Sequence, residues 1–341
     1  MIRPNEISFV LQGAVDRSLN STTGKPVTQS SLESLRTHYP QAEVILSTWQ
    51  GQDVTGLEYD VLVENEDPGG VNCFRPSSGV VRVDNMNRQI VSSKNGLLRA
   101  SGKYAVKLRS DLLLGAPLWM EFLDRYPARV PEWKIFQQRI VTCSLWTRDP
   151  RCPYTDFPYH PSDWIHAGLA DDVRLLWDIP LQPQPESAEW FFTRARSQTP
   201  PLEADLTRMD IDCARYYPEQ YLWTTLLRKF GNIDFEERSH PTEEDIRITE
   251  LSFANNLIIL NPDQIPLASQ KYAYPDGPTR RYYRLISHKE WERLYLSYCA
   301  DKQGVATLKR VADPDFYLKW MYIAAFKPLQ KVRERAVAAK R

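Results

Sequence analysis

The first 65 residues alternate short apolar runs with one amphipathic stretch, and this alternation constrains the fold more than any other feature of the chain. Residues 6–12 read as a buried strand that ends at Gly13, and residues 28–39 read as a helix. Residues 43–48 and 60–63 then read as two further strands. This opening predicts an α/β domain built on an open sheet.

The rest of the chain continues the same alternation. Further helices are predicted at 85–101, 116–126, 168–177 and 218–230, and further strands at 104–108, 139–143 and 257–260. Two loops rich in proline interrupt it, at 146–164 and 179–206, and the second resembles a lid. We expect residues 1–235 to form the core, and 236–341 to be an extension that completes it with helical additions.

Charge and cysteine content limit the function classes. Lys and Arg together number 43, as do Asp and Glu, so no net positive field favours nucleic acid, and an anionic ligand must be bound by a local cluster. The five cysteines are scattered without a CxxC pair, which favours free thiols in a reducing cytosol. We found no signal-peptide pattern and no run of roughly 20 apolar residues, so we expect a cytoplasmic protein.

The last residues, 326–341, form a basic and helix-like run. Such a run is typical of a solvated tail. Beside Phe316, Trp320 and Met321 it also fits an anionic membrane surface. Peripheral contact with the cytoplasmic face of an inner membrane is therefore a second interpretation.

The most informative polar motif follows the strand at 104–108. Lys107, Arg109 and Asp111 alternate, so they share one face of the strand and its end. A diphosphate leaving group needs its charge neutralised, either by a divalent cation on a carboxylate or by direct Lys and Arg contacts. The alternative interpretation, an internal ion pair between Arg109 and Asp111, fits these residues equally well.

Two other segments could contact a nucleotide. The predicted helix at 85–101 opens with amides, an arginine and hydroxyls, and helix N-termini favour anions. Capping by Asp84 or Asn85 explains the same residues. Residues 64–70 have the composition of a turn, and a site for a base or ribose is the secondary interpretation.

Candidates for a catalytic base are less distinctive. Glu219 opens the predicted helix at 218–230, where it could complement the helix dipole or accept a proton from an acceptor hydroxyl. His160 and His166 flank Asp163, which invites a metal interpretation, but the spacing matches no standard zinc pattern. Surface or core histidines are the favoured interpretation.

Seven segments, in this order and spacing, resemble the WavE family of lipopolysaccharide-synthesis proteins. They are ISFVLQGAV, EVILSTWQG, VLVENEDPGG, NMNRQIVSSKNGL, YAVKLRSDLLL, SDWIHAGL and PEQYLW. The resemblance covers about the first two-thirds of the chain and is most specific across residues 85–113. It implies an A-type glycosyltransferase fold, a Rossmann-like mixed sheet flanked by helices, and a role in bacterial surface-glycan assembly.

The resemblance also implies site residues. The strand-end acidic motif of the family corresponds to Arg109, Ser110 and Asp111, and its polar helix to Asn87, Arg88, Gln89 and Ser92. Gln12 and Gly13 lie where this fold admits the nucleotide, Asn65 and Asp67 are candidates for base and ribose, and Asp163, Asp171 and Glu219 compete as base, with Glu219 preferred. Only Asp111 is acidic at the strand end, so it is the candidate ligand of Mg²⁺ or Mn²⁺, and Lys107 and Arg109 could share or replace the work of the cation.

The resulting hypothesis is an inverting glycosyltransferase that moves a sugar from a nucleotide-sugar donor to a lipid-linked or oligosaccharide acceptor of lipopolysaccharide, capsule or a related surface glycan. One alternative is a nucleotidyltransferase or phosphotransferase acting on glycan precursors. Such enzymes normally need more carboxylates for magnesium or a glycine-rich phosphate loop, which the sequence does not show. The other alternative is a non-catalytic glycan-binding protein in a polysaccharide-assembly complex.

Overall fold

The computed structural model describes residues 2–20, 23–75, 79–151, 157–195, 212–231, 233–238, 241–272 and 285–300. The basic run at 326–341 and residues 196–206 of the predicted lid lie outside these ranges. Among the described residues, no helix is both long and apolar enough to cross a membrane.

A seven-stranded mixed sheet forms the centre of the protein, in the order β10-β8-β9-β6-β1-β2-β3. The strands are β1 Ile7–Gln12, β2 Glu43–Trp49, β3 Val61–Asn65, β6 Tyr104–Arg109, β8 Ile140–Cys143, β9 Ile165–Leu169 and β10 Leu257–Leu260. Strand β9 runs antiparallel to both of its neighbours, whereas the other neighbouring pairs are parallel. Strand β1 is buried along its whole length, as expected for a central apolar strand.

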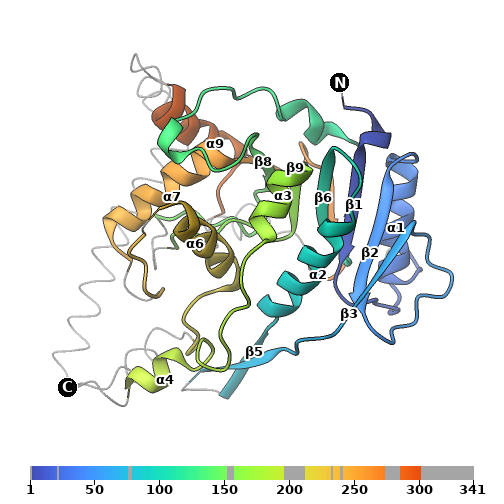
Figure 1. Cartoon of the computed structure of the whole chain (residues 1–341), viewed down its shortest axis with the longest axis horizontal. Helices are drawn as coiled ribbons and strands as arrows, with labels where there is room; N and C mark the ends of the chain where they lie inside the picture. Colours follow the sequence, from blue (N-terminus) through green and yellow to red (C-terminus); the bar gives the residue numbers. More distant parts are fainter. Residues whose placement is uncertain are drawn as a thin grey trace.

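Helices cover both faces of the sheet (Figure 1). Helices α2 Met86–Arg99 and α3 Ala170–Trp177 pack on one face, where α3 also contacts α6 Pro218–Phe230. Helix α1 Val27–His38 lies on the other face, against the short strand β7 Leu112–Leu114. This arrangement confirms the predicted α/β class, a Rossmann-like mixed sheet flanked by helices.

Several further elements belong to the described structure. They are the hairpin of β4 Val71–Arg75 and β5 Gly79–Asp84, helices α4 Trp190–Ala195, α7 Glu243–Asn256 and α9 His288–Tyr295, and strand β11 Leu267–Ser269. Helices α7 and α9 pack against each other and on β10, and β11 pairs with β7. Residues beyond 235 therefore contribute strands to the same sheets as the residues before it.

Two element predictions were wrong in detail. Residues 116–126 contain only the 3₁₀ helix Leu118–Phe122, and Pro127 disfavours helical backbone at the preceding residue, Tyr126. The helix predicted from 168 begins at Ala170, because 165–169 form β9. The hairpin β4–β5 and helices α7 and α9 were not predicted.

Helix α2 approaches the sheet closely at Gly96. A Cβ atom at this position would lie 2.4 Å from Val10 Cγ1 and 2.9 Å from Ser47 Cβ. We expect Gly96→Ala to lower the free energy of unfolding by about 1–3 kcal/mol, because overpacking outweighs the better helix propensity of alanine. Urea unfolding measures the change, and Gly231→Ala is the control because, among the described residues other than its chain neighbours, none has an atom within 4 Å of its added Cβ. Equal stability of the Gly96→Ala and wild-type proteins would contradict this packing.

Candidate functional site

The carboxyl ends of β1 and β6 meet at the point where the strand order reverses. The chain leaves β1 toward β2 on one side, while β6 pairs with β1 on the other. Gly13 has a φ of 119°, and a Cβ there would lie 3.1 Å from Ser110 Oγ, so the two strand ends approach closely. Ligands of open α/β sheets bind in the crevice outside such strand ends.

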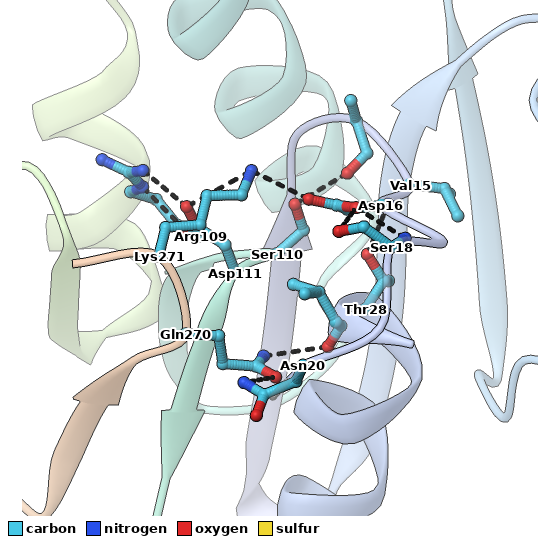
Figure 2. A network of polar contacts seen from close by, with 12 residues as sticks. Val15, Asp16, Ser18, Asn20, Thr28, Arg109, Ser110, Asp111, Gln270 and Lys271 are labelled. Atoms are coloured by element: carbon cyan, nitrogen blue, oxygen red, sulfur yellow. Dashed lines mark hydrogen bonds and ion pairs between the residues drawn. The ribbon is translucent and has the colours of Figure 1, made fainter. Parts of the chain in front are cut away.

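An ion cluster of Asp16, Arg109, Asp111 and Lys271 lies at this edge (Figure 2). Arg109 Nε and Nη2 donate to Asp111 Oδ1 at 3.0 Å and Oδ2 at 2.7 Å. Lys271 Nζ lies 3.7 Å from Asp111 Oδ2 and 3.1 Å from Asp16 Oδ2. The alternative of an internal Arg109–Asp111 pair is therefore present, and it is part of a larger cluster that also contains Asp16 and Lys271.

Two members of the ion cluster, Arg109 and Asp16, have pKa values shifted toward their charged forms. Burial opposes the charge of Arg109, but the Asp111 carboxylate outweighs it and keeps the pKa of Arg109 above its ordinary value. Burial also tends to raise the pKa of Asp16, but hydrogen bonds from Ser18 and the Lys271 ammonium outweigh it and lower that pKa. Two carboxylates and two cations are thus held together at the sheet edge.

The segment that carries Lys271 is fixed by its neighbour Gln270 (Figure 2). The Gln270 backbone N–H donates to the Asp111 carbonyl at 3.1 Å, and Gln270 Nε2 donates to Ser31 Oγ at 2.8 Å. Asn20 Nδ2 donates to Gln270 Oε1 at 3.1 Å. These bonds position Lys271 against two strand ends that are distant from it in sequence.

Aromatic rings border the ion cluster. The Arg109 guanidinium lies 5.5 Å from the centroid of the Trp164 ring. Trp164 stacks on Tyr272 with ring centroids 6.2 Å apart and an angle of 29°. Tyr272 is 51% exposed, so it offers an open aromatic surface beside Lys271.

A second polar group contains Asp163, the residue before Trp164. Asp163 precedes β9, and Glu219 lies in the first turn of α6. Burial, followed by the charge of Asp163, raises the pKa of Glu219 to about 8. His160 Nε2 lies 3.5 Å from Glu219 Oε2, and burial lowers the pKa of His160 to about 3, so this histidine is neutral. Two of the three base candidates are therefore neighbours.

Lys107 is completely buried, contrary to the role expected for it. Its Nζ donates to the Asp163 carbonyl and lies 4.5 Å from the centroid of the Trp177 ring. Burial lowers the pKa of Lys107 to about 7. The expected contact of Lys107 with a diphosphate does not fit this geometry, because Lys107 fixes the backbone next to the base candidates instead. His166 is also a core residue and accepts a hydrogen bond from Trp177 Nε1 at 3.2 Å.

Asp171 lies away from the other base candidates. It follows β9, whose last residue, Leu169, pairs with Tyr104 at the start of β6. The Asp171 side chain is 76% exposed and pairs with Arg174 at 2.8 Å. Asp171 therefore lies on the surface near the amino end of β6, opposite the end that carries Arg109 and Asp111.

The predicted polar residues of α2 and β3 mainly hold the structure together. Ser92 Oγ donates to Gln12 Oε1 at 2.7 Å, and Asn95 Nδ2 donates to the buried Asn65 at 2.8 Å. Asn87 exchanges two hydrogen bonds with the backbone of Gln182, at 3.0 and 2.7 Å. The bonds to Gln12 and Asn65 fix α2 on the ends of β1 and β3, and the bonds of Asn87 fix it to the segment after α3.

Asp67 and Arg88 form a partly exposed pair beyond the end of β3. Arg88 Nε and Nη2 each donate to an Asp67 carboxylate oxygen at 2.7 Å. The Asp67 and Arg88 side chains are 37% and 35% exposed. Of the two residues predicted near the base and ribose, Asp67 therefore remains accessible, whereas Asn65 is buried.

The residues present do not fit the metal site expected at Asp111. Both Asp111 carboxylate oxygens accept from Arg109, and Lys271 lies beside one of them. Within the ranges that the structure describes, no group of three or more His, Cys, Asp and Glu residues could hold a metal ion. A divalent cation would have to displace Arg109 or share its carboxylate.

Comparison with known proteins gives one family. The sequence pattern described as WavE lipopolysaccharide synthesis matches residues 7–321, which extends the resemblance beyond the first two-thirds of the chain. No curated protein shows significant similarity to this chain.

Solved structures show only weak likeness. HddC from Yersinia pseudotuberculosis is 9% identical over 49% of this chain and 78% of its own, with a TM-score of 0.28. The same protein complexed with GMP-PN is 10% identical over 51% and 80%, with a TM-score of 0.29. An active-site mutant of LgtC is 12% identical over 85% and 95%, with a TM-score of 0.30. These scores are too low to transfer any site residue.

Proposed function

This chain belongs to the WavE lipopolysaccharide synthesis family, and we propose that it is a glycosyltransferase acting from a nucleotide-sugar donor onto a growing lipopolysaccharide or related surface-glycan acceptor. One observation carries the proposal: the consecutive residues Asp163 and Trp164 connect a carboxylate pair suited to a base with a charged group suited to a diphosphate. Trp164 contacts Arg109, and burial, followed by the charge of Asp163, raises the pKa of Glu219.

The donor is proposed to lie across the ends of β1 and β6. Arg109 and Lys271 would bind the diphosphate, and Gly13 would let the nucleotide approach the backbone. The nucleoside would extend toward β3, where Asp67 is accessible. Tyr272 would stack against a ring of the donor, because it is exposed beside Lys271.

The proposed reaction is a single displacement. The acceptor hydroxyl oxygen forms a bond to the anomeric carbon while the bond from that carbon to the diphosphate oxygen breaks. The Glu219 carboxylate accepts the hydroxyl proton, and Arg109 and Lys271 stabilise the charge on the departing diphosphate. With a pKa of about 8, Glu219 is a stronger base than an ordinary carboxylate, but only roughly a tenth of it is ionised at pH 7.

Binding of nucleoside diphosphates tests the donor class. We expect one of UDP, GDP, CDP and ADP to raise the melting temperature, because a ligand that binds only the native state stabilises it. The matching nucleoside without phosphate is the control and should give a much smaller shift. If none of the four nucleotides shifted the melting temperature, the non-catalytic glycan-binding alternative would be favoured instead.

A further inference from the structure

In the ion cluster, two cationic side chains balance two carboxylates, as a divalent cation does in a metal site. Asp16 and Asp111 converge on one ammonium group, with Lys271 Nζ at 3.1 and 3.7 Å from their oxygens. Asp111 also holds Arg109 through two hydrogen bonds. Two carboxylates with two monovalent cations have the same formal charge as two carboxylates with one divalent cation.

We propose that Lys271 and Arg109 together take the place of a divalent cation, so that the diphosphate of the donor binds without a metal. This inference rests on the proposed function and names the groups that neutralise the leaving diphosphate. Asp16 and Asp111 then act as positioning residues, because they orient the two cations.

Both cations can still reach a ligand. Arg109 has five N–H donors, and its contacts with Asp111 use one on Nε and one on Nη2. The Arg109 and Lys271 side chains are 24% and 45% exposed, whereas Asp111 is only 5% exposed. The cations therefore face solvent while the carboxylate that orients them is buried.

A divalent cation competes poorly for this position. Mg²⁺ requires close oxygen ligands in a near-octahedral arrangement. Both oxygens of Asp111 already lie within 3.0 Å of Arg109 nitrogens, and the positive charge of Arg109 would repel the ion. Gln270 fixes the segment that brings Lys271 to this point, so the ammonium is built into the site.

Calorimetric titration with UDP, GDP, CDP and ADP tests the proposal, each in EDTA and in Mg²⁺. We expect the dissociation constant of the nucleotide that binds to differ by less than about threefold between the two conditions. Lys271→Met should weaken that binding in EDTA by about tenfold or more, because a charge-assisted contact is lost. Lys94→Met is the matched control, since Lys94 is 41% exposed and pairs with Asp178 at 2.6 Å.

The outcomes separate this inference from the proposed function. Binding that requires Mg²⁺ would overturn the inference and leave the glycosyltransferase proposal in place. Binding by folded Lys271→Met as tight as by Lys94→Met would do the same. Absence of binding by all four nucleotides in both conditions would overturn the proposed function, and the inference with it.

Discussion

Replacement of Asp111 by asparagine is expected to lower kcat/KM for sugar transfer by about 100-fold or more. Asparagine keeps the shape of the side chain but removes the charge that holds Arg109 and Lys271 at the end of β6. Both cations would then lose their orientation toward the leaving diphosphate, and groups placed to stabilise transition-state charge commonly contribute about 100- to 1,000-fold. Asp111→Ala should be at least as inactive. Steady-state kinetics with the identified donor measures the loss.

The control for this variant is Asp171→Asn. Asp171 also pairs with one arginine, but it is exposed and lies near the amino end of β6, opposite the end that carries Arg109 and Asp111. We expect Asp171→Asn to keep wild-type activity, and Asp111→Asn to remain folded by circular dichroism. Near-normal turnover by Asp111→Asn would place the active site elsewhere.

Replacement of Glu219 by glutamine is expected to reduce kcat by about 100- to 10,000-fold, the usual contribution of a general base. The wild-type kcat/KM should rise as the pH increases through about 8 and level off above that pH, because only ionised Glu219 can accept the proton. The residual activity of Glu219→Gln should lack this dependence. A pH series of both proteins measures the effect, and a rise through pH 8 that persists in Glu219→Gln would contradict the assignment of the base.

Stability gives an independent check on Glu219. Its pKa is about 8 in the folded protein and 4.5 ordinarily, so the unfolded chain releases the proton first. Its contribution to the free energy of unfolding is therefore present below about pH 4.5 and is lost as the pH rises toward 8. Relative to wild type, Glu219→Gln should become more stable as the pH is raised from 5 to 8. If the difference in melting temperature between the two proteins did not change with pH over this range, Glu219 would not be buried as described.

Local patterns were sufficient to predict that Arg109 and Asp111 lie together at the candidate site. The apolar run before Arg109 predicted β6, and the two-residue period of a strand predicted that Arg109 and Asp111 would lie together. The two-residue period does not predict which element packs on the strand. Helix α3 covers it with Trp177, which is why Lys107 is buried rather than directed at a ligand.

The rest of the site depends on tertiary contacts. Lys271 reaches Asp111 only because β11 pairs with β7 and Gln270 bonds to the strand end, and no local pattern encodes either contact. Asp16 lies in the loop just after the first strand, and this position was the one sequence feature that could have indicated its place in the candidate site. Strand β9 was missed because His166 and Gly168 interrupt its apolar pattern.

The most direct test of the account is transfer itself. Purified wild-type protein is incubated with UDP-, GDP-, CDP- and ADP-sugars and truncated lipopolysaccharide, and the release of nucleoside diphosphate and the mass of the acceptor are followed. We predict that one donor yields its nucleoside diphosphate together with an acceptor heavier by one sugar, and that Asp111→Asn gives neither product. A folded wild-type protein that releases no nucleoside diphosphate from any donor, with or without acceptor, would contradict the assignment as a glycosyltransferase.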